Sequence, residues 1–251
     1  MQVLIAPSAS EVGRFAAGRI VDVVRRRPDA VLGLATGSSP LDIYAELARR
    51  VAAGDLDLSA VRAFALDEYI GLPPGHPQSY HAVIEREVVK PTGMDPAKVR
   101  VPNGFAEDLD TACEEFEREL AAVGPVDVQI LGVGTNGHIG FNEPMSSFGS
   151  RTRVKRLTPA TRQANARFFD SVDEVPELCL TQGIATVMEA RELLLVAQGT
   201  AKAEAVARMV EGPVSSSCPG SVLQFHPSAT VIVDEPAASR LEFTDYYEHL
   251  S

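Results

Sequence analysis

A glycine-rich loop carries a histidine and a glutamate that could perform acid–base chemistry. It follows an apolar run, Val126 to Leu131, that predicts a buried strand. Residues 132–144 read Gly-Val-Gly-Thr-Asn-Gly-His-Ile-Gly-Phe-Asn-Glu-Pro. Glycine lets a backbone approach a ligand closely, and Glu143 is near enough in the chain to orient the imidazole ring of His138. We interpret the loop as part of a site that handles a small polar molecule by proton transfer.

The spacing of Gly132, Gly134 and Gly137 also matches the pattern of dinucleotide-binding loops. That pattern needs a helix to open at the third glycine, so that the helix N-terminus can hold a pyrophosphate. Gly140 and Pro144 would interrupt such a helix in its first two turns. Basic residues also stand where an acidic residue should bind a ribose hydroxyl. The sequence therefore favours an irregular loop over a dinucleotide site.

A pair of carboxylates, Asp67 and Glu68, follows a second apolar run, Val61 to Leu66. The pair could be a solvated cap on a turn. A carboxylate directly beyond a parallel strand is, however, well placed for proton abstraction. We favour Asp67 as a catalytic base and expect partial desolvation to raise its pKa once the segment over the site closes.

Two further loops predict a phosphate site. Thr36, Gly37, Ser38 and Ser39 stand between a predicted strand and a predicted helix, where they offer backbone N–H groups, hydroxyls and a helix dipole to an anion. A plain turn with a serine helix cap is the alternative. Lys202 stands in the first turn of another predicted helix, where a cation is unfavourable unless it meets an anion. Together the two loops favour a phosphate monoester.

Several basic residues gather in one segment of an acidic chain: Arg151, Arg153, Lys155, Arg156, Arg162 and Arg167. Most such residues are solvated, and we expect one or two of them to meet anions. The chain has no paired cysteines, His-x-x-x-His pattern or tight carboxylate cluster to indicate a metal. It also has no Gly-x-Ser-x-Gly or Cys/His pairing to indicate a covalent nucleophile. These patterns predict an acid–base enzyme without metal or organic cofactor.

Short apolar strands alternate with amphipathic helices along the chain. The predicted strands cover residues 3–6, 30–35, 61–66, 99–101, 126–131, 193–197 and 230–233. This alternation predicts an α/β fold with a doubly wound, mostly parallel, Rossmann-like sheet of about seven strands and helices on both faces. The loops described above then share the carboxyl edge of the sheet, where ligands bind.

Residues 151–184 break this alternation with two helix-like pieces, 159–169 and 182–190. We expect this segment to form a mobile helical lid over the carboxyl edge, within a single domain that spans residues 1–251.

Composition excludes several classes of partner. The chain has 251 residues, 45% of them apolar, and a net charge of −11, which argues against nucleic acid and anionic membranes. Three cysteines without metal spacing suit a reducing compartment. The N-terminus lacks the features of a signal peptide, and no apolar run is long enough to span a membrane. We expect a cytoplasmic protein.

Four motifs resemble those of the glucosamine-6-phosphate deaminase family, and the resemblance extends along nearly the whole chain. They are Leu-Asp-Glu-Tyr-Ile-Gly-Leu at 66–72, Gly-Thr-Asn-Gly-His-Ile-Gly-Phe-Asn-Glu-Pro at 134–144, Ser-Arg-Thr-Arg at 150–153 and Ala-Asn-Ala-Arg-Phe-Phe at 164–169. The related phosphogluconolactonases share a glycine-rich Gly-His loop but lack the Phe-Asn-Glu-Pro that follows.

The resemblance implies conversion of glucosamine 6-phosphate and water to fructose 6-phosphate and ammonia, without metal or cofactor, in amino-sugar catabolism. By the same resemblance, Asp67 moves a proton between C2 and C1 of the open sugar, and His138 opens the ring with Glu143 as its partner. Position 136 is aspartate in some members; Asn136 can orient His138 but cannot hold a charge. The phosphate site would comprise Thr36, Gly37, Ser38, Ser39, Arg167 and Lys202.

Some members of that family are hexamers activated by N-acetylglucosamine 6-phosphate at subunit contacts. The resemblance places Ser146, Arg151, Arg153 and Lys155 in this effector site, but the C-terminal tail that contributes to it looks shortened here. A hexamer and a monomer therefore both stay open. Two other functions also stay open, namely a phosphogluconolactonase-like hydrolase and a non-enzymatic sugar-phosphate sensor. The sensor is disfavoured because neither end of this acidic chain resembles a DNA-binding segment.

Overall fold

The computed structural model describes residues 1–73 and 75–250, so the last residue of the predicted domain, Ser251, lies outside it. Eight strands form one sheet in the order β11-β1-β10-β9-β6-β2-β3-β5, and the recorded strand pairs within it are all parallel. The strands are β1 (Gln2–Ala6), β2 (Val31–Leu34), β3 (Arg62–Ala65), β5 (Val99–Arg100), β6 (Val128–Leu131), β9 (Glu192–Ala197), β10 (Ala229–Asp234) and β11 (Glu248–His249). The predicted parallel sheet is confirmed, and β11 adds one strand to the seven that were expected.

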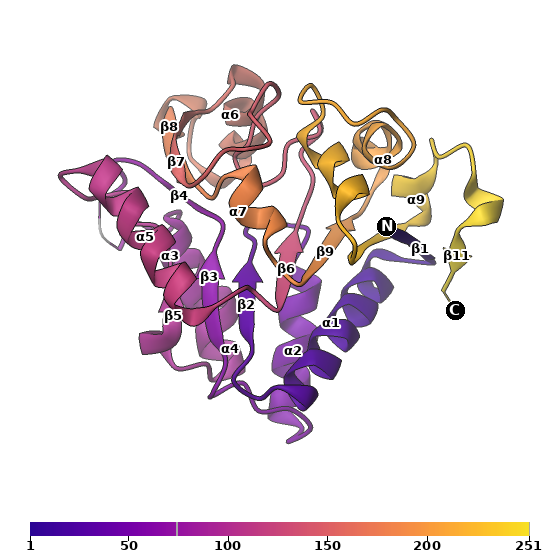
Figure 1. The fold of residues 1–251 in the computed structure, drawn as a ribbon, viewed down its shortest axis with the longest axis horizontal. Helices are drawn as coiled ribbons and strands as arrows, with labels where there is room; N and C mark the ends of the chain where they lie inside the picture. The colour runs from indigo at the N-terminus through magenta and orange to yellow at the C-terminus, as the bar shows by residue number, and fades with distance from the viewer. Residues whose placement is uncertain (74, 251) are drawn as a thin grey trace.

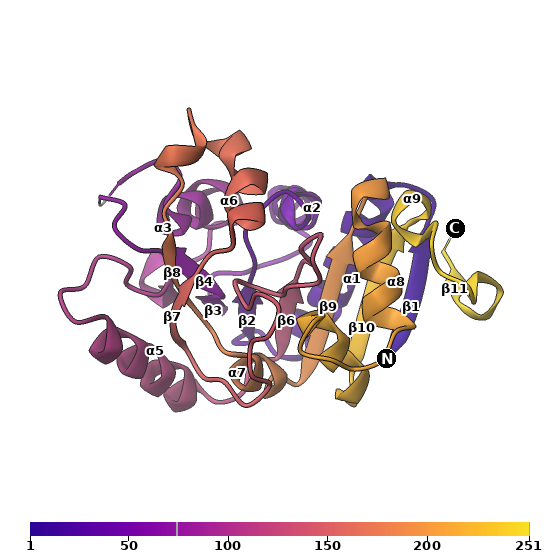
Figure 2. The ribbon, with the colours of Figure 1, turned by 90° about the horizontal axis from the view of Figure 1, so that it is seen from above.

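Helices cover both faces of this sheet. Helix α1 (Ala9–Arg26) contacts α2 (Leu41–Ala52) as well as β9 and β10. Figure 2 shows α2 and α3 (Tyr80–Ile84) on one side of the strands, and α5 (Leu109–Val123) and α7 (Ile184–Met188) on the other. The remaining α-helices are α4 (Lys90–Thr92), α6 (Pro159–Asn165), α8 (Ala203–Val210) and α9 (Glu235–Ala238). None of the helices in the described residues is both long enough and apolar enough to cross a membrane.

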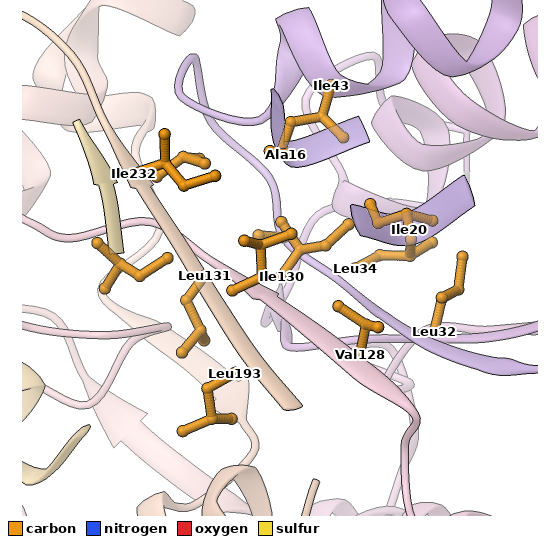
Figure 3. Close-up of a cluster of buried hydrophobic side chains, with 14 of the residues drawn as sticks. Ala16, Ile20, Leu32, Leu34, Ile43, Val128, Ile130, Leu131, Leu193 and Ile232 are labelled. Carbon is orange, nitrogen blue, oxygen red and sulfur yellow. The ribbon is translucent and has the colours of Figure 1, made fainter. Parts of the chain in front are cut away.

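The core lies between α1, α2 and the central strands. Ile20 of α1, Leu34 of β2 and Ile130 of β6 are each at most 1% exposed, and Figure 3 shows Ile20 beside Leu34. All four residues of β2 and of β6 are buried, because helices shield both faces of these strands. This burial explains why the strands read as continuous apolar runs, and it makes the sheet a rigid support for the loops at its edge.

The order of the strands reverses between β2 and β6. From β2 the chain moves outward through β3 to β5, and from β6 it moves the opposite way through β9 to β10. In open parallel sheets the ligand crevice lies beyond the carboxyl ends of the strands at such a reversal. The loops that leave β2 and β6 there are residues 35–40 and 132–144.

A second, smaller sheet was not expected. Strands β4 (Asp67–Tyr69), β7 (Arg153–Arg156) and β8 (Leu178–Thr181) pair antiparallel in the order β4-β8-β7. Figure 1 shows α6, β7 and β8 above the arrowheads of β2, β3 and β6. Residues 151–184 therefore do lie over the carboxyl edge, but this segment is built on two strands as well as helices. Its mobility stays a prediction.

Candidate active site

A cavity of about 280 Å3 opens at the carboxyl edge beside the junction of β2 and β6. It is lined from all four strand ends that the sequence singled out, by residues 36–39, Asp67, His138 and Lys202. Arg167 joins them from the segment above the edge. The structure therefore confirms that these loops converge on one cavity.

One end of the cavity is suited to an anion. Helix α2 begins after Ser38 and Ser39, Pro40 occupies its cap position, and no side chain caps the helix. The structure therefore does not have the serine-capped turn that the sequence left open as an alternative. Gly37 takes a φ of +87°, a value that glycine adopts readily and that lets the chain turn sharply into α2. The amides and hydroxyls of this turn are the kind of donors that bind phosphate.

Two cations stand at the same cavity. Arg167 donates from Nη2 to Ser38 Oγ at 3.3 Å, and Lys202 donates from Nζ to the carbonyl of Val133 at 2.7 Å. Burial, followed by repulsion from Arg167, lowers the pKa of Lys202. Like charges held together and partly withdrawn from water favour an anion between them. Of the basic residues gathered between 151 and 167, Arg167 alone lines this cavity in the described structure.

Asp67 has the environment of a base that works near neutral pH. Its side chain lies in β4, only 4% exposed, and it also lines the cavity. Burial raises the pKa of Asp67 to about 8, with a further contribution from the charge of Glu68, against the opposing effect of the backbone N–H of Phe141. The pKa of Asp67 is thus raised in the expected direction, mainly by desolvation, and its dependence on closure of the lid stays a prediction.

His138 and Glu143 form a pair in the glycine-rich loop. Oε2 of Glu143 lies 3.5 Å from Nδ1 of His138, and Oε1 accepts hydrogen bonds from the backbone N–H and the hydroxyl of Thr158, both at 3.1 Å. Burial alone would raise the pKa of Glu143, but the nearby polar groups of His138, Thr161 and Thr158 outweigh it and lower the pKa to about 2. Glu143 is therefore a fixed anion that can hold a proton on Nδ1 and leave Nε2 for a ligand.

Asn136 forms hydrogen bonds to both members of this pair. Its amide donates to Glu143 Oε2 at 2.8 Å and accepts from the backbone N–H of His138 at 3.2 Å. Neither Asn136 nor Glu143 lines the cavity. Any influence of these two residues on a molecule in the cavity would therefore pass through His138.

The packing of His138 explains why position 134 of the loop is a glycine. A Cβ atom at this position would lie 2.2 Å from Cε1 of His138, so the imidazole ring occupies the space that a side chain would need. No helix opens after Gly137; the chain instead forms a bridge between Ile139 and Asn142. The irregular loop predicted in place of a dinucleotide site is confirmed.

Several cavity residues were missed by the sequence analysis. They are Gln78, Tyr80, Val83, Phe141, Asn165 and Phe168. Asn165 donates to the hydroxyl of Tyr69 at 2.9 Å, and this hydroxyl lies 3.5 Å from that of Tyr80. Phe141 belongs to the glycine-rich loop, and Asn165 and Phe168 belong to the 164–169 motif, but no pattern showed that their side chains line the cavity. Tyr80 and Val83 reach it from α3, and Gln78 from the segment just before that helix.

The four residues assigned to an effector site do not line the cavity. Arg151 is engaged with Glu117 at 2.6 Å and with Glu189 at 2.5 Å. Arg153 and Lys155 lie two residues apart on β7, and burial lowers the pKa of Arg153. Ser146 is 2% exposed, and its hydroxyl has no hydrogen-bond partner among the described residues. An effector role for these residues stays a prediction.

Comparisons with known proteins agree with this geometry. The model of the family described as "Glucosamine-6-phosphate isomerases/6-phosphogluconolactonase" matches residues 6–232. The chain is 56% identical to the glucosamine-6-phosphate deaminase of Pseudarthrobacter chlorophenolicus, over 99% of this chain and 96% of that relative. It is 52% identical to the protein of the same name from Streptomyces avermitilis, again over 99% and 96% of the two chains.

Two solved structures help to separate fold from function. A monomeric glucosamine-6-phosphate deaminase superposes with a TM-score of 0.94 at 42% identity, over 96% of this chain and all of that one (100%). The 6-phosphogluconolactonase of Trypanosoma cruzi superposes with a TM-score of 0.76 at 16% identity, over 96% of this chain and 97% of that one. The second likeness extends to the fold alone.

Proposed function

The chain belongs to the glucosamine-6-phosphate isomerase/6-phosphogluconolactonase family, and we propose that within it this protein is a glucosamine-6-phosphate deaminase. The enzyme converts glucosamine 6-phosphate and water to fructose 6-phosphate and ammonia. The observation that carries the proposal is one cavity shared by a base with a pKa of about 8, a histidine oriented by a buried carboxylate, and an anion-binding end.

Binding begins at the anion end of the cavity. The phosphate of the sugar accepts hydrogen bonds from the turn at residues 36–39 and faces the charges of Arg167 and Lys202. This places the reacting carbons of the sugar away from the phosphate, towards Asp67 and His138. Because these contacts do not change during the reaction, they contribute to binding rather than to the chemical steps.

His138 opens the pyranose ring. Nε2 accepts the proton of the anomeric hydroxyl, and a proton is returned to the ring oxygen as the C1–O bond to the ring breaks. Glu143 stabilises the imidazolium that forms, since its low pKa keeps it ionised throughout. Asn136 holds Glu143 in place for this step.

Asp67 then moves a proton between adjacent carbons. Its ionised carboxylate removes the proton from C2 of the open aldehyde, O1 gains a proton, and an enolamine forms. The carboxyl group then delivers its proton to C1 while the amino nitrogen loses one, which leaves a hydroxyl on C1 and an imine at C2. Water adds to this imine, and ammonia leaves as the ketone of fructose 6-phosphate forms. A carboxyl group with a pKa near 8 is a stronger base than an exposed aspartate and is still partly ionised near neutral pH.

A coupled assay for fructose 6-phosphate and ammonium tests the proposal. Both products should appear in equal amounts from glucosamine 6-phosphate. In heavy water, solvent deuterium should appear at C1 of the product over long incubation. A phosphogluconolactonase would hydrolyse the lactone and release no ammonium, and a sensor would bind the sugar phosphate without turnover.

We also propose that the protein is a monomer, supported by its likeness to the monomeric deaminase. Sedimentation at micromolar concentration tests this. If Ser146, Arg151, Arg153 and Lys155 formed a working effector site, N-acetylglucosamine 6-phosphate would straighten a sigmoidal rate curve. A hyperbolic curve that ignores this compound would remove the effector role. The cytoplasmic location stays a prediction, and the net charge of −11 supports neither a nucleic-acid nor a membrane partner.

A further inference from the structure

Glu68 is a buried carboxylate that the proposed reaction does not use. It follows Asp67 directly in β4, so the two side chains point to opposite faces of that strand. Glu68 is 6% exposed, and its oxygens accept three backbone N–H groups: Tyr69 and Tyr80 on Oε1 and His81 on Oε2, each at 2.8 Å. The carboxylate is thus held by the backbone of two different elements.

Two of these donors belong to the N-terminus of a helix. Tyr80 and His81 are the first two residues of α3, which continues through a π-helical turn, Glu85–Val89, into α4. The hydroxyl of Ser79 accepts the next N–H, that of Ala82, at 3.2 Å. Glu68 and Ser79 therefore satisfy the first three N–H groups of the helix, which have no partner within it.

The same helix forms one wall of the cavity. Its residues Tyr80, Val83, Arg86 and Glu87 line the space into which Asp67 also faces. One carboxylate, adjacent to the base in the chain, therefore joins the strand of the base to this wall.

We propose that Glu68 is a positioning residue, whose single carboxylate fixes both the strand that carries Asp67 and the helix that faces it across the cavity. The inference rests on the proposed role of Asp67 as the base. A fixed anion next to the base also acts on it through space, so the role has an electrostatic consequence that can be measured.

Burial raises the pKa of both carboxyl groups of this pair. Three backbone N–H donors oppose this effect on Glu68, whereas a single one opposes it on Asp67, so we assign the negative charge to Glu68. Other titratable groups also surround the pair. Tyr69, Tyr80 and Cys179 face Asp67 from β4, α3 and β8, His138 shares the cavity, and His81 faces Glu68. Because Tyr80 and His81 are themselves held by Glu68, a replacement that keeps the charge is needed beside one that removes it. A shift in the titration of Asp67 that occurs with glutamine and not with aspartate at position 68 reports the charge of Glu68.

The test compares Glu68→Gln with wild type in the pH dependence of kcat/KM. Glutamine keeps an acceptor for Tyr69 and Tyr80 but removes the charge and the acceptor for His81. We expect the acid limb, which reports protonation of the base, to move to lower pH by about one unit. Inhibition by inorganic phosphate should change less than about twofold, because the anion end is untouched. The matched control is Glu85→Gln, a partly exposed position on the same helix, which should leave the limb in place.

A folded, active Glu68→Gln enzyme with an unshifted acid limb would overturn the inference while the deaminase function stands. Absence of ammonium release by the wild type would instead remove the function itself. If Glu68→Gln does not fold, the Glu68→Asp variant tests the positioning role instead. It keeps the charge but draws the carboxylate back by one carbon, so kcat should fall at least about tenfold with the limb unmoved. A Glu68→Asp enzyme with wild-type kcat would exclude the positioning role.

Discussion

The side-chain amide of Asn136 donates a hydrogen bond of 2.8 Å to Oε2 of Glu143. Its oxygen accepts the backbone N–H of His138 at 3.2 Å. The position therefore needs one donor and one acceptor, and an aspartate supplies only acceptors. Asn136 thus supports the charge of Glu143 rather than adding a charge of its own.

Asn136→Asp should weaken ring opening. It places a second carboxylate against Glu143, which raises the pKa of Glu143 above its present value of about 2 because like charges disfavour ionisation. We expect the acid side of the kcat profile to move to higher pH. Measuring kcat from pH 4 to pH 9 tests this, with the exposed Asn103→Asp as a control. A profile identical to that of the wild type would show that the amide is dispensable.

Gly134→Ala should remove activity without unfolding the protein. The new Cβ would lie 2.2 Å from Cε1 of His138, so the ring must leave its place. The φ angle of Gly134 lies outside the left-handed region, so no backbone strain is added. We expect kcat to fall by about two orders of magnitude with a misplaced catalytic group, while the melting temperature changes by a few degrees.

A matched control for this substitution is Gly149→Ala, where a Cβ would meet its nearest atom, Ser147 Oγ, at an ordinary 3.8 Å. This variant should behave like the wild type. Wild-type activity in the Gly134→Ala variant would mean that His138 does not need its observed position.

Lys202→Met and Arg167→Met should each raise KM while kcat stays close to the wild-type value. Each variant loses a charged contact to the phosphate worth about 1.5–3 kcal/mol, which corresponds to a rise in KM of about tenfold or more. The control is Arg156→Met in the same segment, whose partner is the exposed Glu177. A fall in kcat at unchanged KM would instead place the two cations in the chemical steps.

Asp67→Asn should abolish turnover and yet stabilise the fold at alkaline pH. Burial raises the pKa of Asp67 from 3.8 to about 8, so between these values the folded protein keeps a proton that the unfolded chain releases. The wild type therefore loses stability as the pH rises through this window, and asparagine removes that loss. At pH 8 the variant should be more stable by at least about 1 kcal/mol, the equivalent of one pKa unit.

Urea unfolding at pH 5 and pH 8 measures this difference. Asp57→Asn is the control, because the pKa of this exposed group is lowered by its hydrogen bonds to Ser59 and its stability effect should be constant between those two pH values. A gap between Asp67→Asn and wild type that does not widen from pH 5 to pH 8 would contradict the raised pKa.

The sequence was sufficient for the main sheet and for much of the site. Strands such as β2 and β6 read clearly because both of their faces are buried, and Asp67, His138 and Lys202 followed from their places at strand ends. The small sheet could not be read. Only Leu66 separates β3 from β4, so the two strands look like one, and the partner of β4 lies more than a hundred residues away in the chain.

The walls of the cavity were hidden for the same reason. Tyr80 lies at the cavity in a helix whose first N–H groups donate to Glu68. Asn165 lies there with its side chain hydrogen-bonded to the hydroxyl of Tyr69. Such placements depend on pairs of residues that come together only in the folded chain, whereas helix and strand patterns report on neighbours.

One row of backbone pairing runs from Arg153 on β7 through Thr181 on β8 to Asp67 on β4. The reacting carboxylate is therefore anchored in the same small sheet as an outer strand that carries no reacting group. A displacement of β7 would therefore be passed to the backbone of Asp67 through a single row of paired strands, without any contact between a bound molecule and the cavity.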